Sequence, residues 1–277
     1  DAYNVAIGYD AGKSVSTGTH NIILGGLAGD SLTTGSANIA IGYEALSTED
    51  GHSQNIAIGY QALKMLDAGA AGLNVAVGHQ AGTAMTTGIK NTLIGGLAGD
   101  AITTGYQNVA LGYRALSTED TGRSSIAIGN DALLNQNFDG SAYNIAIGDS
   151  AGLSVTTGIQ NTIIGGLAGD ALTTGSENIA IGQNALGAED TGSHSVAIGK
   201  KALFNQNFDG SAYNIAIGHQ AGLSVTTGTE NVFLGGLAGD ALTIGKHNVA
   251  IGYESLSSAN AGDFSVAIGH SALREQA

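Results

Sequence analysis

The pentapeptide Asn4-Val-Ala-Ile-Gly8 decides how this sequence is interpreted, because it returns with small variations until it has occurred sixteen times. Successive copies begin 17, 17, 17 and then 19 residues apart, and this series itself repeats every 70 residues. Self-similarity at a short, fixed period is the mark of a repeat architecture. The sequence therefore predicts a single repeat domain over residues 1–277, with four blocks at approximately 4–73, 74–143, 144–213 and 214–277.

Each unit has the pattern of one short strand followed by tight turns. The second and fourth residues of the pentapeptide are β-branched or apolar and the third is usually Ala, an alternation typical of a β-strand. The fifth is Gly in every unit, which suits a corner with positive φ. Units this short fit neither helix pairs nor propeller blades. The pattern predicts an all-β fold, a parallel β-solenoid (β-roll) of sixteen coils, about 75 Å long at the strand spacing of about 4.8 Å.

Two columns of the repeat are expected to hold neighbouring coils together. The first position is Asn in thirteen units and Ser in three. Stacked Asn side chains can bond one another and nearby backbone groups, and we favour this ladder over a polar binding row because unpaired polar groups at a buried corner are costly. The predicted ladder and its glycine corners comprise Asn4, Asn21, Asn38, Asn55, Asn74 and Asn91 with Gly8, Gly25, Gly42 and Gly59.

The second unit of every block departs from the pattern, since its third residue is bulky where the other units have Ala. We expect the second and fourth residues to point into the coil and the third to point outward. Large outward apolar groups predict a surface buried against another chain, with a fold-back of the same chain as the alternative. The predicted chain interface comprises Ile23, Leu93, Ile163 and Phe233, together with Leu27, Leu97, Leu167 and Leu237 of the same units.

Composition and charge exclude several classes of partner. Nine Lys and Arg against 23 Asp and Glu give a net charge of −14, which argues against nucleic-acid binding. The sequence has no Cys, so disulfides and thiolate metal sites are excluded. No apolar run approaches the roughly 20 residues of a membrane span, so we expect no membrane insertion by this segment. The missing initiator Met predicts a processed product or a segment of a longer protein.

Catalysis needs a unique constellation, whereas this chain offers near-equivalent copies, so we predict no enzymatic activity and no cofactor. The seven His include no pair with zinc-site spacing and are expected at the solvated surface. Tyr and His recur just past the Gly corner, where stacking between coils is favoured over sugar or receptor binding. Turn formation by Asn and Asp is favoured over Ca²⁺ binding in two loops, at Asn135 and Asp139 and at Asn205 and Asp209.

The repeated units Ser195-Val-Ala-Ile-Gly199 and Ser265-Val-Ala-Ile-Gly269, with Asn-Ile-Ala-Ile-Gly elsewhere, resemble the head repeats of trimeric autotransporter adhesins of the YadA type. Similar repeats occur in phage tail fibres, and the resemblance spans essentially the whole chain. It implies a left-handed β-roll, three chains side by side, an extracellular location on a cell or virion surface, and a role in attachment. The 17- and 19-residue units are longer than the family's usual repeat, and the 70-residue block is unusual for it.

These observations predict a non-enzymatic extracellular fibre segment, an adhesin head or a tail-fibre shaft, that mediates or supports attachment to a surface or host. Its partners would be further copies of the same chain, with a trimer implied by the resemblance, and a receptor that the sequence does not identify. The alternative is a subunit of an extracellular filament that stacks end to end through uncapped solenoid ends, which would leave open strand edges.

Overall fold

The computed structural model describes residues 2–69, 71–258 and 262–275. Two compact units divide the chain, residues 1–142 and 143–277, and each contains eight strands of three residues. The described residues contain no helix, so the predicted all-β class and parallel β-solenoid are confirmed. The strands of the first unit are β1 (Val5–Ile7), β2 (Ile22–Leu24), β3 (Ile39–Ile41), β4 (Ile56–Ile58), β5 (Val75–Val77), β6 (Thr92–Ile94), β7 (Val109–Leu111) and β8 (Ile126–Ile128). Those of the second are β9 (Ile145–Ile147), β10 (Thr162–Ile164), β11 (Ile179–Ile181), β12 (Val196–Ile198), β13 (Ile215–Ile217), β14 (Val232–Leu234), β15 (Val249–Ile251) and β16 (Val266–Ile268).

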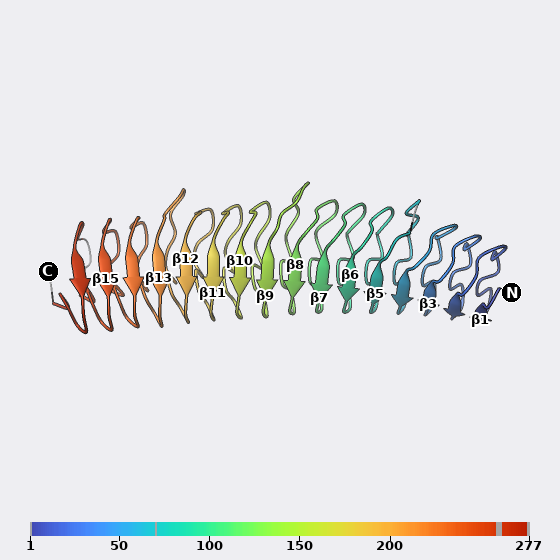
Figure 1. Cartoon of the computed structure of the whole chain (residues 1–277), viewed down its shortest axis with the longest axis horizontal. Helices are drawn as coiled ribbons and strands as arrows, with labels where there is room; N and C mark the ends of the chain where they lie inside the picture. Colours follow the sequence, from blue (N-terminus) through green and yellow to red (C-terminus); the bar gives the residue numbers. More distant parts are fainter. Residues whose placement is uncertain (1, 70, 259–261, 276–277) are drawn as a thin grey trace. The chain divides into compact units, whose positions relative to one another are not determined.

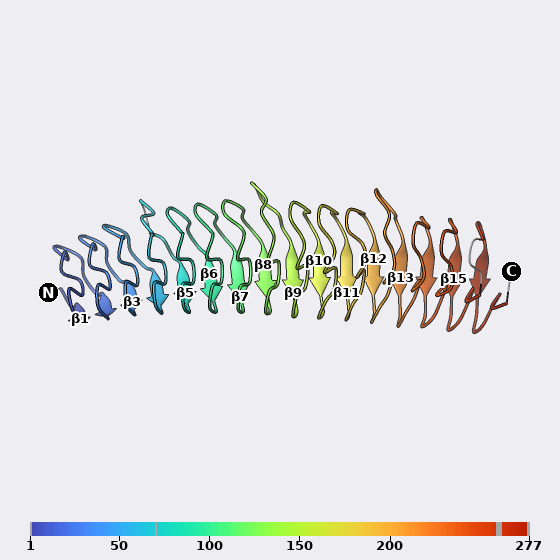
Figure 2. The same ribbon diagram turned by 180° about the vertical axis from the view of Figure 1, so that it is seen from behind.

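Within each unit the strands pair in parallel and in chain order, as Figure 1 shows. The register follows the repeat, so that Val5 lies beside Ile22 and Ile22 beside Ile39. The 19-residue coils keep this register, since Ile56 of β4 pairs with Val75 of β5. Their two additional residues lie in longer loops, which stand out after β4, β8 and β12 in Figure 2. Insertions are therefore absorbed in the loops while the sheet stays regular.

The predicted Asn ladder is confirmed. Asn21 is fully buried, and its Oδ1 accepts a hydrogen bond of 2.9 Å from the backbone N–H of Asn38 in the next coil. Its Nδ2 donates to the carbonyl oxygen of Gly35 at 2.9 Å. At the Ser rungs the preceding Asn still accepts the backbone bond, as Asn108 does from Ser125 at 3.1 Å. Each Asn thus satisfies backbone groups that the coil cannot pair by itself.

The glycine corners are also confirmed, and two independent constraints explain them. Gly8 and Gly25 have φ of +142° and +137°, a region that side chains rarely adopt. A Cβ placed on Gly8 would lie 2.6 Å from the carbonyl carbon of Gly25 in the next coil. Gly42 and Gly59 repeat both features, so a side chain at this column would push the coils apart.

The predicted direction of the strand side chains is wrong. The third residue of the pentapeptide points into the coil, and the second and fourth point outward, so the central residue is buried in every strand from β2 to β16. The bulky residues assigned to a chain interface are accordingly core residues, none more than 1% exposed: Ile23, Leu93, Ile163 and Phe233. They cannot contact another chain in this fold.

Volume explains why the second coil of each block needs a large inward residue. Gly12 and Gly29 occupy the ninth position in the first two coils, and a Cβ on Gly12 would lie 2.8 Å from Cδ1 of Ile23. In the third and fourth coils the ninth position is Leu, as at Leu46 and Leu63, and the inward strand residue is Ala. Both leucines are fully buried at positive φ, where a side chain costs roughly 1–2 kcal/mol. Large side chains therefore fill the same interior from different columns.

Phe233 provides a test of this packing. Replacing it with Ala should lower the free energy of unfolding by about 3–5 kcal/mol, because the ring is fully buried and the cavity is enclosed by neighbouring coils. Phe233→Leu, which reproduces the residue at the equivalent position 93, should cost less than half as much. Denaturant unfolding followed by circular dichroism measures both. Equal stability of all three proteins would contradict the inward placement.

Candidate functional site

The outward residues of the strands form an aliphatic face on each unit. This face consists of the second and fourth residues of the pentapeptide in every coil, and none of them is buried. In the second unit, Ile147 of its first strand is 37% exposed, and Ile217 of β13, in the middle of the unit, is 41% exposed. Thr92 and Thr162 are the only polar residues among these thirty-two outward positions, and no position carries a charge. Exposed apolar faces of this kind are typical of contact surfaces.

The remaining four residues of the predicted interface lie at a turn rather than on the sheet face. Leu27, Leu97, Leu167 and Leu237 all have positive φ, near +57° at Leu27. They are partly exposed, Leu167 to 38%, and the structure does not bring them into the aliphatic face. Their burial against another chain stays a prediction.

The aromatic residues after the Gly corner stack from coil to coil, as predicted. The ring centroids of Tyr43 and Tyr60 are 5.7 Å apart, and those of Tyr60 and His79 are 5.3 Å apart, in near-parallel planes. In the second unit Tyr253 and His270 are 5.5 Å apart. Tyr43 and Tyr60 remain nearly half exposed, so the column also offers aromatic surface to a partner.

The two loops considered for Ca²⁺ lie at the surface, with Asn135, Asp139, Asn205 and Asp209 all exposed. Asp209 accepts a hydrogen bond of 2.7 Å from the hydroxyl of Thr191, and Asp139 accepts the equivalent bond from Thr121. These bonds join each loop to the preceding coil, which is the turn chemistry expected of Asp. Calcium binding here stays a prediction.

A column of side chains lies inside the solenoid at the twelfth residue of the coil, counted from the ladder Asn or Ser. This column is apolar in the first two coils of a block but holds a fully buried Glu in the third coil of blocks one to three. Glu119 accepts hydrogen bonds from the N–H of Gly122 at 2.8 Å, from Nε2 of Gln136 at 2.8 Å and from the N–H of Phe138 at 3.4 Å. Burial nevertheless raises the pKa of the Glu119 carboxyl group.

The buried Glu is tied to the ladder through the Gln of the next coil. Nε2 of Gln206 donates to Oε2 of Glu189 at 2.8 Å and to the hydroxyl of Ser195 at 2.8 Å. Oε1 of Gln206 accepts a bond of 2.8 Å from Nδ2 of Asn214. The Ser rung thus leaves room for Gln, and Gln carries the hydrogen-bond network across that rung.

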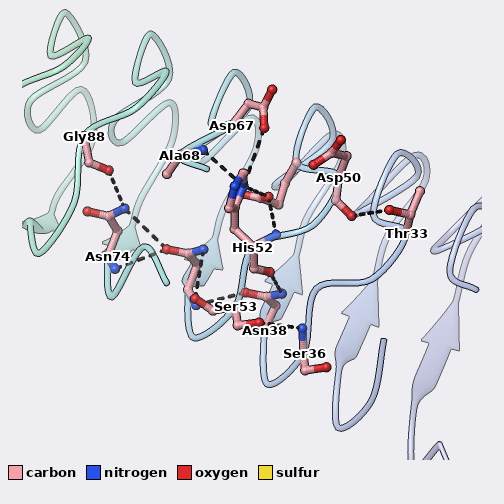
Figure 3. Close-up of polar contacts among 12 residues, drawn as sticks. Thr33, Ser36, Asn38, Asp50, His52, Ser53, Asp67, Ala68, Asn74 and Gly88 are labelled. Carbon is pink, nitrogen blue, oxygen red and sulfur yellow. Dashed lines mark hydrogen bonds and ion pairs between the residues drawn. The ribbon is translucent and has the colours of Figure 1, made fainter. Parts of the chain in front are cut away.

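Block one departs from this arrangement, and Figure 3 shows the polar contacts around His52 there. Leu66 stands where the other two blocks have Gln, and His52 stands where they have Gly122 and Gly192. His52 is only 7% exposed, so the expectation that all seven His are solvated is wrong for this residue. Its backbone N–H donates to Oε1 of Glu49 at 2.7 Å, and its Nδ1 contacts the same oxygen. Burial raises the pKa of the Glu49 carboxyl group.

A sequence signal for His52 exists, but pairwise His spacing does not reveal it. Aligning the 17-residue coils by their ladder residue places Gly at the fifteenth position in eleven of the twelve, and His52 is the exception. A Cβ at the equivalent Gly122 would lie 2.6 Å from Oε2 of Glu119. A side chain in this column is therefore forced against the buried carboxylate.

Comparisons with known proteins returned nothing: no family model, no curated protein and no solved structure matches this chain. In the part of the chain that the structure describes, no helix is long and apolar enough to cross a membrane. The features of the chain that bear on function are the aliphatic face, the aromatic column and the buried polar cluster.

The raised pKa of Glu119 predicts a pH dependence of stability. A carboxyl group whose pKa is higher in the folded than in the unfolded chain binds more protons when folded, so its contribution to stability is lost as pH rises from its ordinary value through the raised one. Glu119→Gln removes this term and keeps a group that can bond Gln136. The stability of the variant relative to the parent, measured by denaturant unfolding, should therefore increase from pH 4 to pH 8. A constant difference would contradict the assignment.

Proposed function

We propose that this chain is a non-enzymatic segment of an extracellular fibre, in which three copies pack together through their aliphatic faces and support attachment to a surface or host. The observation that carries the proposal is the face itself, two rows of outward aliphatic side chains in every coil. The trimer, the extracellular location and the attachment role rest on the resemblance of the Ser-Val-Ala-Ile-Gly and Asn-Ile-Ala-Ile-Gly units to adhesin head repeats.

The size of the face supports association. Each strand presents about 50 Å², from about 4.8 Å of strand spacing and about 3.3 Å per residue over three residues. Eight strands therefore give roughly 400 Å² on each unit, about half the area that one partner contributes to a standard protein interface. The composition is also that of an obligate contact, because thirty of the thirty-two outward residues are aliphatic.

A copy of the same chain is the partner that fits this face best. Its side-chain rows repeat once per coil, and another chain with the same repeat presents rows at the same interval. The outward side chains of each coil can then pack between those of two successive coils of the partner chain, along the length of one compact unit. Parallel association would also bring several copies of the exposed column at Tyr43, Tyr60 and His79 into one assembly, and repeated weak contacts give high avidity for a surface.

Charges on the aliphatic face test the proposal. The variant Ile58→Asp/Ile128→Asp/Ile198→Asp places one carboxylate on each of three outward strand positions, where burial against another chain would be costly. Light scattering should give three chain masses for the parent protein and one for the variant. Circular dichroism should show that the variant keeps its β-structure, because these side chains point away from the coil interior.

A matched control places the same charges elsewhere. Thr34, Thr104 and Thr174 are exposed loop residues, and their replacement by Asp should leave the mass at three chains. A monomeric parent protein, or an Asp variant at the strand positions that stays trimeric, would refute the proposed interface. Long filaments in electron micrographs of the parent protein would instead favour end-to-end stacking.

A further inference from the structure

The buried carboxylate of Glu49 has an oxygen that nothing satisfies. The residue is fully buried, and its Oε2 is the only buried side-chain nitrogen or oxygen without a hydrogen-bond partner among the residues that the structure describes. A buried charged group left without a partner costs several kcal/mol, so native proteins pair such atoms with a donor or an ion. This oxygen therefore points to a missing ligand.

Block two shows which hydrogen-bond donors Oε2 of Glu49 lacks. Oε2 of Glu119 receives bonds from the next coil, from Nε2 of Gln136 at 2.8 Å and the N–H of Phe138 at 3.4 Å. In block one the first donor is replaced by Leu66, which cannot donate. The backbone donor equivalent to Phe138 is the N–H of Ala68, and it donates to Nδ1 of His52 at 3.1 Å. Both donors to Oε2 are absent for Glu49.

The groups that surround Glu49 are those that bind metal ions. His52 replaces the Gly of this column, and Asp67 of the next coil lies with its Oδ1 3.5 Å from Nδ1 of His52. Asp50 completes the cluster, whose four ligand atoms all lie within 4.8 Å of one another (Figure 3). The equivalent positions of block two hold Gly122 and Asn137, so the cluster belongs to block one alone.

The ring of His52 lies among carboxylates. Its Nδ1 contacts Oε1 of Glu49 and is 3.5 Å from Oδ1 of Asp67, and Asp50 belongs to the same cluster. A divalent cation suits three carboxylates around one imidazole, because it offsets the repulsion between the acceptor oxygens.

We propose that Glu49, His52 and Asp67, with Asp50 at the exposed side, bind one divalent transition-metal ion per chain, and that Zn²⁺ is an ion the site accepts. One imidazole nitrogen with carboxylate oxygens is a ligand set of zinc proteins, whereas Ca²⁺ takes oxygen ligands only. The ion links the third coil of block one to the fourth. In block two, the hydrogen bond from Gln136 to Glu119 joins the corresponding two coils.

Zinc titration of the complete chain, freed of any affinity tag and of metal by chelation, tests the site. Isothermal titration calorimetry should give one Zn²⁺ per chain, and thermal unfolding should shift to higher temperature when Zn²⁺ is added. The conservative variant Asp67→Asn should weaken binding by at least about tenfold, because it removes one anionic ligand without changing shape.

The chain offers its own control. The double variant His52→Gly/Leu66→Gln rebuilds the arrangement of block two, so it should fold with the parent's circular dichroism spectrum and lose both the binding and the thermal shift. Zinc binding retained by this variant would place the ion elsewhere and overturn the proposal. A parent protein with no saturable zinc binding would overturn it as well, and would assign the contact between Glu49 and His52 to a shared proton.

Discussion

The structure depends on how little room one coil encloses. Seventeen residues must make a strand and return to the start of the next coil, and the space inside is too narrow for large side chains from every inward position. Ala therefore occupies the strand centre in most coils, as at Ala40 and Ala57, and the large aliphatic residues of the strand face outward. A narrow interior thus produces an apolar exterior. Burial of that exterior against other copies of the chain would supply the hydrophobic stabilisation that one chain alone lacks.

The narrow coil also requires tight turns, and these turns place many residues at positive φ. At least four residues have positive φ in each of the first fifteen coils, and where the ninth residue is Leu three of them are not Gly. Leu46 and Leu63 illustrate the balance, since each adopts an unfavourable conformation and is completely buried in return. The Asn ladder completes this balance, because each side chain bonds one backbone N–H and one backbone carbonyl that the tight corner leaves unpaired. Corners, ladder and core therefore depend on one another and cannot be changed separately.

The sequence predicts the parts of this fold that depend on periodicity. The coil length, the strand, the glycine corner and the Asn ladder all follow from columns of identical residues. The direction of the strand does not, because alternation tells which residues share a face but not which face is inside. Side-chain volumes distinguish the two faces. A bulky third residue such as Ile23 occurs in a coil whose ninth residue is Gly, here Gly29, whereas Leu46 at the ninth position occurs with Ala40 at the third. The burial of His52 does not follow from the spacing of the His residues, because its sequence signal is the Gly column that it interrupts.

The buried polar column gives a nearly uniform repeat a means of distinguishing its coils. Coils of such similar sequence could stack in the wrong order during folding, because their strands and ladders are interchangeable. Oε2 of Glu189 accepts a hydrogen bond from Gln206 of the coil beside it, and a neighbouring coil without Gln at this position would leave that buried bond unmade. The order of coils three and four is therefore specified by chemistry and not by shape alone. Block one lacks this pair, since Glu49 faces the coil of Leu66, and a bound cation would restore there the specific link that Gln supplies elsewhere.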